Sequence, residues 1–211
     1  MIKLLYLEVS PRKAASASIE VARAFIDAYR AAHPSDEIEI LDLWSLDLPP
    51  LDEDALNAKY AGIYGDGRSP AQAAAWSRME ALAAPLLAAD KLLMAVPLWN
   101  FSIPYRLKHY IDLVSQKDIL FSFDQTGFGG LMKAKKAAVI YARGLDYAPT
   151  SNWTPGERYD FQRPYVEAWL RFIGLTDIQG VVVERTLFGL EADAKARRVA
   201  ASEARAMAED F

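Results

Sequence analysis

The chain has 211 residues, 52% of them hydrophobic and 25% charged, which is typical of one folded domain and unlike disordered, collagen-like or coiled-coil chains. A net charge of −4 without any long basic run disfavours a nucleic-acid partner. Because there is no cysteine and there are only two histidines, disulfides and thiolate chemistry are excluded and no metal site is expected.

In the first half of the chain, short apolar runs alternate with helical patterns. The predicted elements are a strand over 2–9, a helix over 16–33, a strand over 37–43, an irregular stretch over 44–69 and a helix over 70–89. The alternating pattern of 37–43 is typical of a strand near a sheet edge. Pro85 is expected to bend or shorten the alanine-rich helix that contains it.

The second half contains strands with continuous apolar residues, which is typical of strands covered on both faces. The predicted elements are a strand over 91–96, a loop over 97–104, a helix over 105–115, a strand over 136–142, a long loop over 143–159, a helix over 162–172, a strand over 178–184 and a helix over 191–208. Gly174 is expected to adopt the left-handed conformation that ends the helix before it.

Five strands separated by helices predict a parallel sheet with right-handed crossovers, in a doubly wound three-layer α/β fold. The order 2-1-3-4-5 suits five strands, and we expect one domain over 1–211. No apolar run approaches the ~20 residues of a membrane span, and the N-terminus is too short and strand-like for a signal peptide. We therefore expect a cytoplasmic protein with no membrane partner. Ligands of such folds bind at the carboxyl ends of the strands, which directs attention to the loops 10–18, 97–104 and 143–160.

The first of these loops carries three hydroxyl groups at the start of a predicted helix. Ser10, Ser16 and Ser18 lie where free backbone N–H groups and the helix dipole favour an anion, and Arg12 adds a positive charge. No glycine-rich dinucleotide or P-loop pattern is present. The alternative is that Ser16 is only the N-cap of the helix.

The second loop is bracketed by Pro97 and Pro104, which stiffen the path from a buried strand into a helix. Trp99 and Phe101 offer flat faces to a planar ring, and Asn100 between them offers a donor and an acceptor. The alternative is that both aromatic side chains belong to the core.

In the third loop, Gly144 allows close backbone approach to a ligand, and Arg143 either offsets negative charge on it or forms a surface ion pair. Of the histidines, His109 is expected to be a half-buried helical residue rather than a proton donor. Asp112 is expected to pair with Lys108 one helical turn before it. Six aromatic residues are expected in long loops that act as lids or subunit contacts, with the alternative that several of the rings pack beneath their own loops: Tyr60, Tyr64, Tyr147, Trp153, Tyr159 and Phe161.

Three motifs together resemble the FMN-dependent NADH-azoreductase family, which is flavodoxin-like and related to the NAD(P)H:quinone oxidoreductases. The motifs are Ser10-Pro-Arg with Ser16 and Ser18, then Pro97-Leu-Trp-Asn-Phe-Ser-Ile-Pro104, and Leu107-Lys108-x-x-Ile111-Asp112. The resemblance covers nearly the whole chain. It implies an FMN site made by Ser10, Arg12, Ser16, Ala17, Ser18, Pro97, Leu98, Trp99, Asn100, Phe101, Arg143 and Gly144.

Within that site, the resemblance implies that the serines hold the FMN phosphate and that Leu98–Phe101 lies along the isoalloxazine, with Asn100 positioning the ring. A further motif of the family, after the fourth strand, is usually Ser-Arg-Gly-Gly. Here it reads Ala142-Arg143-Gly144-Leu145, so a hydroxyl and a glycine are missing. This departure concerns the contact to the pyrimidine end of the flavin.

The implied activity is that of an FMN-dependent NAD(P)H oxidoreductase, with NADH or NADPH as the donor. Quinones and azo compounds, which are small flat aromatic substrates, would be reduced by ping-pong hydride transfer through the flavin, without a catalytic side chain. The resemblance also implies a homodimer whose active site lies at the subunit interface.

Two other classes of protein remain as alternatives. A flavodoxin-type electron carrier would bind FMN without oxidising NADH directly; the aromatic loops and the small net charge disfavour it, because carriers rely on strong electrostatic steering. A hydrolase or phosphatase using the loop 10–18 as an anion cradle would lack both a cysteine nucleophile and a G-x-S-x-G elbow.

Overall fold

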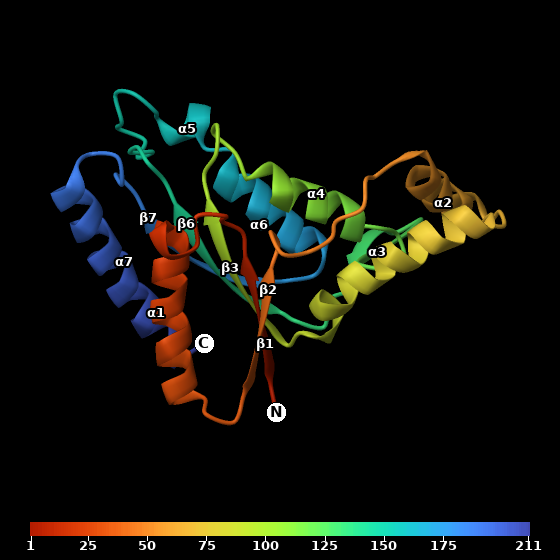
Figure 1. Cartoon of the computed structure of the whole chain (residues 1–211), viewed down its shortest axis with the longest axis horizontal. Coiled ribbons are helices and arrows are strands. Elements are labelled where there is room, and N and C mark those ends of the chain that lie inside the picture. Colours follow the sequence, from red (N-terminus) through yellow and green to blue (C-terminus); the bar gives the residue numbers. More distant parts are fainter.

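The computed structural model describes residues 1–211, and its centre is a five-stranded parallel sheet of order β2-β1-β3-β6-β7 (Figure 1). The strands are β1 (Lys3–Glu8), β2 (Glu37–Asp42), β3 (Lys91–Pro97), β6 (Lys136–Ala142) and β7 (Asp177–Val183). Because β6 and β7 are the fourth and fifth strands of this sheet, the predicted order 2-1-3-4-5 is confirmed. The amphipathic strand β2 lies at an edge, as its pattern predicted.

Helices cover both faces of the sheet, so the fold has three layers (Figure 1). One face is covered by α1 (Ala17–Ala32) and α7 (Leu190–Glu209), and the other by α3 (Pro70–Ala88), α4 (Tyr105–Val114) and α6 (Gln162–Phe172). Side chains alternate between the two cores along each strand. In β1, Leu4 and Tyr6 pack with α1, whereas Leu5 and Leu7 pack in the core on the other face.

The prediction that 44–69 is irregular was wrong, because this stretch contains α2 (Glu53–Tyr64). The carboxylate of Asp52 caps the helix by accepting the N–H of Ala55 at 3.1 Å, and Gly65 ends it in the left-handed conformation at φ 78°. Pro49, Pro50, Gly65 and Gly67 therefore lie outside the helix, on either side of it, whereas Gly62 lies within its last turn. Tyr60 and Tyr64 consequently lie on a helix and not in a loop.

Two details of the other helices concern glycine and proline. Gly174 follows α6 with a φ of 113°, so the predicted left-handed residue is confirmed. Pro85 lies inside α3, which continues for three further residues to Ala88. Two short helical segments lie in the loops at the carboxyl end of the sheet: a 3₁₀ turn, η1 (Lys13–Ala15), and α5 (Gly156–Tyr159).

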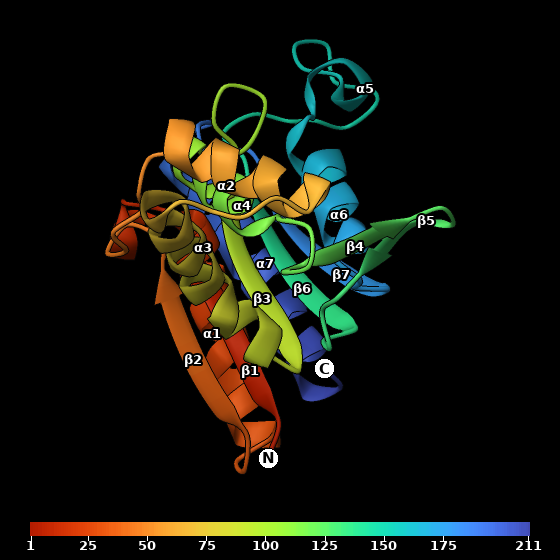
Figure 2. The ribbon, with the colours of Figure 1, turned by 90° about the vertical axis from the view of Figure 1, so that its right-hand side faces the viewer.

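A two-stranded antiparallel hairpin, β4 (Phe121–Asp124) and β5 (Gly127–Gly130), was not predicted and projects from the body beside α6 (Figure 2). Its base is anchored where α6 ends. A Cβ atom on Gly130 would lie 2.2 Å from the backbone of both Ile173 and Gly174, and the N–H of Met132 donates to the carbonyl of Ile173 at 3.0 Å. Only glycine fits at this contact.

We expect the substitution Gly130→Ala to lower the free energy of unfolding by about 1–3 kcal/mol, because the backbone of Gly174 must move to admit the methyl group. Urea-induced unfolding measures this. Gly67→Ala is the matched control, since no atom lies within 4 Å of the added methyl group, and its effect is expected to stay within about 0.5 kcal/mol. Equal losses in the two variants would contradict the close contact.

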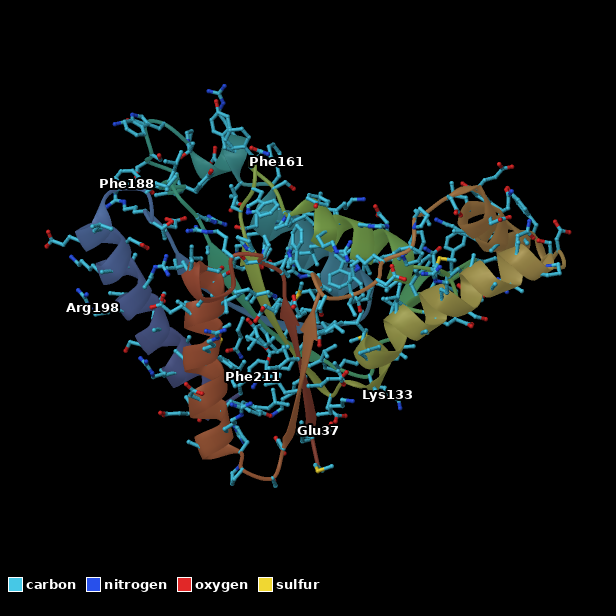
Figure 3. All side chains as sticks on the ribbon, in the orientation of Figure 1. Glu37, Lys133, Phe161, Phe188, Arg198 and Phe211 are labelled. Atoms are coloured by element: carbon cyan, nitrogen blue, oxygen red, sulfur yellow. The ribbon has the colours of Figure 1, made fainter.

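The two ends of the sheet carry different segments of the chain. Phe161 and Phe188 lie at the end where the strands finish, whereas Glu37 and Phe211 lie toward the opposite end (Figure 3). The long loops and α5 gather at the first of these ends (Figures 1 and 2). None of the helices combines the length and the apolar character needed to cross a membrane.

Candidate functional site

The three loops singled out from the sequence converge at the carboxyl ends of β1, β3 and β6, around a cavity of about 180 Å³. The cavity is lined by Ser10, Arg12, Ser16, Ala17, Pro97, Leu98, Trp99, Ala142, Arg143, Gly144, Thr186, Leu187 and Arg197. Three predicted site residues do not line it: Ser18 is fully buried behind Ser16, and Asn100 and Phe101 form the tip of the adjacent turn.

The hydroxyl groups of the first loop surround the start of α1. Ser16 occupies the N-cap position, yet its side chain makes no capping hydrogen bond; its Oγ lies 3.1 Å from the Oγ of Ser18. The side chain of Ser10, also buried, accepts the N–H of Arg12 at 3.3 Å. The first N–H groups of α1 are thus left without a side-chain cap, as an anion-binding site requires. This observation disfavours the alternative that Ser16 serves only as a cap.

Lys13 fixes the loop in place and is not a candidate ligand for an anion. Its backbone is left-handed at φ 48°, and its Nζ lies 2.7 Å from Glu8 Oε1 and 2.6 Å from Asp42 Oδ1. Burial acts to lower the pKa of Lys13, but the hydrogen bonds to Asp42 and Glu8 outweigh it and raise the pKa. With this cation neutralised, Arg12 is the exposed cation of the loop that forms no ion pair within the chain.

The second loop contains a tight turn. Trp99 and Ser102 exchange two backbone hydrogen bonds of 2.9 and 3.0 Å around Asn100 and Phe101, whose φ angles of 47° and 71° are both left-handed. Asparagine adopts this conformation readily, but phenylalanine does so only with backbone strain. In proteins, strained backbone of this kind is concentrated at functional sites. The N–H of Leu98 donates to the carbonyl of Ala142 at 2.8 Å and fixes the turn relative to β6.

The aromatic side chains of this turn are not core residues. Phe101 is exposed, with its ring centroid 5.2 Å from that of Tyr159. Trp99 is half-buried, and its ring centroid lies 6.1 Å from that of Trp44 and 6.4 Å from that of Tyr105. Trp99 also lines a second, larger hollow of about 580 Å³ on the far side of the turn, together with Asn100, Tyr105, His109 and Tyr165. The 180 Å³ cavity at the start of α1 and the larger hollow therefore meet at the turn, because Trp99 lines both.

Two side chains of α4, the helix after this loop, make contacts that agree with the sequence predictions. Lys108 Nζ lies 2.6 Å from Asp112 Oδ1, which confirms the predicted pair. His109 is half-buried on α4, and its Nε2 lies 2.8 Å from the carbonyl oxygen of Pro49. Since a carbonyl only accepts, this nitrogen carries the proton and holds the segment before α2 in place, which agrees with a structural role.

Arg143 occupies neither of the two environments expected from the sequence. Only 5% of its side chain is exposed, so it is not a surface ion-pair partner, and its guanidinium donates to Asp160, Glu184 and Gln162 at 2.5, 3.0 and 3.1 Å. The two carboxylates neutralise its charge, which leaves none to offset a ligand. Arg143 instead connects the ends of β6 and β7 to the loop before α6.

The connection between β7 and α7 contributes cavity residues that the sequence analysis missed. Thr186 donates to the carbonyl of Arg143 at 3.1 Å, and the side chain of Leu187 lies against Gly144, where an added Cβ would be 2.6 Å away. Arg197 reaches the cavity from α7. Their position in the chain could have indicated these residues. The connection follows the fifth strand of the sheet and therefore lies at the same end of the sheet as the three loops.

A family model described as "Flavodoxin-like fold" matches residues 2–208 of the chain. The chain belongs to this flavodoxin-like family. It is 57% identical over the full length of both chains to "FMN-dependent NADH:quinone oxidoreductase 9" of Burkholderia lata. It is 50% identical to "FMN-dependent NADH:quinone oxidoreductase 3" of Pseudomonas fluorescens, covering 100% of this chain and 98% of the relative.

Solved structures agree with this assignment to the flavodoxin-like family. An azoreductase from Bacillus anthracis superposes with a TM-score of 0.88 at 29% identity over the whole of both chains. A second protein from that species, an FMN-dependent NADH-azoreductase solved in complex with FMN, gives a TM-score of 0.82 at 25% identity, covering 99% of this chain and 100% of the other.

The residues of the cavity fit FMN. The start of α1 offers backbone N–H groups with no side-chain cap, Ser10 and Ser16 offer hydroxyls, and Arg12 offers an unpaired cation, which together suit a phosphate dianion. The Trp99–Ser102 turn presents backbone groups and aromatic faces next to that cradle, as a planar ring system with a polar edge requires.

Proposed function

We propose that this flavodoxin-like protein is an FMN-dependent NADH:quinone oxidoreductase that also reduces azo compounds. The observation that carries the proposal is that a hydroxyl-lined helix start shares one cavity with Pro97, Leu98 and Trp99, the residues that lead into the strained turn. The names of the relatives at 57% and 50% identity support it over the electron-carrier alternative.

In this proposal, Ser10, Ser16 and the N–H of Ala17 hold the FMN phosphate together with Arg12, and Ser18 orients the Ser16 hydroxyl. The segment 97–101 lies along the isoalloxazine ring. FMN held there would supply the redox chemistry, taking a hydride from NADH and passing two electrons to the acceptor, whose protons would come from water rather than from a catalytic acid of the chain. Its contribution is to orient the ring and to leave one face open to flat substrates.

The deciding experiment is a visible absorption spectrum of the purified protein, followed by anaerobic addition of NADH. We expect a flavin spectrum that NADH bleaches and that a quinone or an azo dye restores. A flavin spectrum that NADH leaves unchanged would instead support the electron carrier, and a colourless protein that takes up no FMN would contradict the proposal.

The side chain of Asn100 is predicted to position the flavin ring. Asn100→Gly removes its amide while keeping a residue that adopts φ near 47° without strain. We expect kcat/KM for NADH to fall about tenfold, because one hydrogen bond to the ring is lost, while the urea midpoint stays unchanged. Steady-state kinetics beside urea unfolding test this, and wild-type kinetics in the variant would rule out the positioning role.

We further propose a homodimer with the active site at the interface, acting in the cytoplasm. Exposed apolar side chains support a partner surface: Phe123, Phe128 and Leu131 on and beside the hairpin, and Tyr60 and Tyr64 on α2. Light scattering coupled to gel filtration tests the dimer, for which a monomer at micromolar concentration is the contrary result. Cell fractionation tests the location.

A further inference from the structure

A third cavity, of about 280 Å³, lies beside the flavin cavity, on the other side of the connection between β7 and α7. Leu187 packs against Gly144 in the flavin cavity, whereas its neighbour Phe188 and nearby Arg185 line the third cavity. Phe188 marks its place at the carboxyl end of the sheet (Figure 3). Nothing in the mechanism above uses this cavity.

The third cavity has an aromatic wall that is open to solvent. Trp153 is 74% exposed and Phe188 is 46% exposed, with ring centroids 6.2 Å apart and planes inclined by only 30°. Tyr147 in the same loop is buried instead, so the exposure of Trp153 is not a general property of this loop. Large flat rings left exposed next to a cavity are suited to stacking against a planar ligand.

A single oriented guanidinium stands beside this wall; its one carboxylate partner, Asp146, also lines the cavity, but unlike Lys13 and Arg143, which each pair with two carboxylates, Arg185 is mostly exposed and keeps free N–H donors for a phosphate oxygen. Arg185 adopts a left-handed backbone at φ 63°, and its Nε and Nη2 lie 3.1 and 2.6 Å from Asp146 Oδ2, while its Nη1 forms no hydrogen bond. The side chain of Arg185 remains 59% exposed. The N–H of Ala148 and then Arg185 lower the pKa of Asp146, which stays ionised and holds the guanidinium in one direction.

The loop that carries Trp153 is held by its own polar groups. Thr154 is buried, and its hydroxyl donates to the carbonyl of Asp146 at 2.6 Å, while its N–H donates to Ser151 Oγ at 3.2 Å. The aromatic wall and the cation are therefore presented by a preformed loop, which lowers the entropic cost of binding a ligand between them.

We propose that this third cavity binds the adenosine diphosphate half of the dinucleotide donor, with adenine on Trp153 and the pyrophosphate at Arg185. The inference rests on the proposed function, because the nicotinamide of the same donor must lie over the flavin. A ligand that reaches both cavities needs a second planar ring joined to the reacting ring through an anionic link. NADH has this construction, whereas a simple quinone has one ring and no anion.

The direct test is calorimetric titration of ADP-ribose into the FMN-loaded protein. Trp153→Ala and Arg185→Gln are each expected to weaken ADP-ribose binding about tenfold, and Trp153→Phe is expected to restore most of it, because a flat face is kept. Leu190→Ala is the matched control, since Leu190 is an almost fully exposed neighbour that does not line the cavity. Equal affinity in Trp153→Ala and Leu190→Ala would overturn the proposal.

Anaerobic stopped-flow reduction of the flavin separates the donor from the acceptor. In Trp153→Ala, the Kd for NADH is expected to rise about tenfold with an unchanged limiting rate and an unchanged KM for benzoquinone. A raised KM for benzoquinone with unchanged NADH binding would assign the cavity to the acceptor and overturn the proposal.

The two proposals fail in distinguishable ways. If Trp153→Ala and the wild type oxidise NADH identically, the oxidoreductase function stands and the adenosine site is refuted. If the protein takes up no FMN, the function is refuted, and ADP-ribose titration of the colourless protein still tests the third cavity: binding that depends on Trp153 supports the site, and no binding refutes it.

Discussion

Replacing Ser16 with aspartate is expected to abolish FMN binding without weakening the fold. The substitution removes a hydroxyl from the phosphate cradle, a hydrogen bond to a charged group worth about 1.5–3 kcal/mol, and adds a negative charge facing the phosphate. Affinity for FMN is expected to fall at least about 100-fold. Titration of the apoprotein, followed by quenching of flavin fluorescence, measures the loss.

The same substitution is expected to preserve or raise stability when FMN is absent. Aspartate is as good an N-cap as serine, and a carboxylate at the start of α1 interacts favourably with the helix dipole, by about 0.3–1 kcal/mol. Ser16→Ala is the control, which loses the same hydrogen bond, about 10- to 150-fold in affinity, without the added repulsion. If Ser16→Asp bound FMN within tenfold of the wild type, the phosphate could not lie at this helix start.

Replacing Arg143 with methionine is expected to destabilise the fold by about 3–5 kcal/mol, because Asp160 and Glu184 would be left without their cation in a buried site. The guanidinium is 5% exposed and satisfies three side chains, so no solvent molecule replaces it easily. Urea-induced unfolding of the apoprotein measures the change without any contribution from the cofactor.

Arg163→Met is the matched control, because Arg163 is 47% exposed and pairs only with Glu167, at 2.7 Å. Its removal is expected to cost about 0–1 kcal/mol, as for other surface ion pairs. Arg143→Lys keeps the charge but loses the planar fork, so its stability is expected to lie between those of the wild type and Arg143→Met. Comparable losses in Arg143→Met and Arg163→Met would show that the buried cluster contributes little.

The inner strands could be predicted from the sequence almost to the residue. The strand expected over 136–142 is β6 as observed, and the one expected over 91–96 extends by one residue to Pro97. Both are covered on two faces, so their apolar runs are continuous and end where the chain leaves the core. Once the strand order follows, the carboxyl ends of the strands locate the cavity without coordinates.

Features that depend on tertiary contacts could not be predicted in this way. Helix α2 is held by alanines buried against α3 rather than by a strong apolar stripe, and the need for glycine at Gly130 of the β4–β5 hairpin comes from its contact with the end of α6. The role of Arg143 depends on Asp160 and Glu184, which are 17 and 41 residues away in sequence. No local pattern reports such a pairing.

The flavin cavity draws its walls from four separate parts of the chain, 10–17, 97–99, 142–144 and 186–197. Loss of any one strand end therefore opens the cavity, so FMN dissociation is linked to unfolding of the entire sheet. By mass action, free FMN at 100 times its Kd adds about 2.7 kcal/mol to the free energy of unfolding. The melting temperature of the protein is therefore expected to rise with the concentration of free FMN and to report cofactor occupancy.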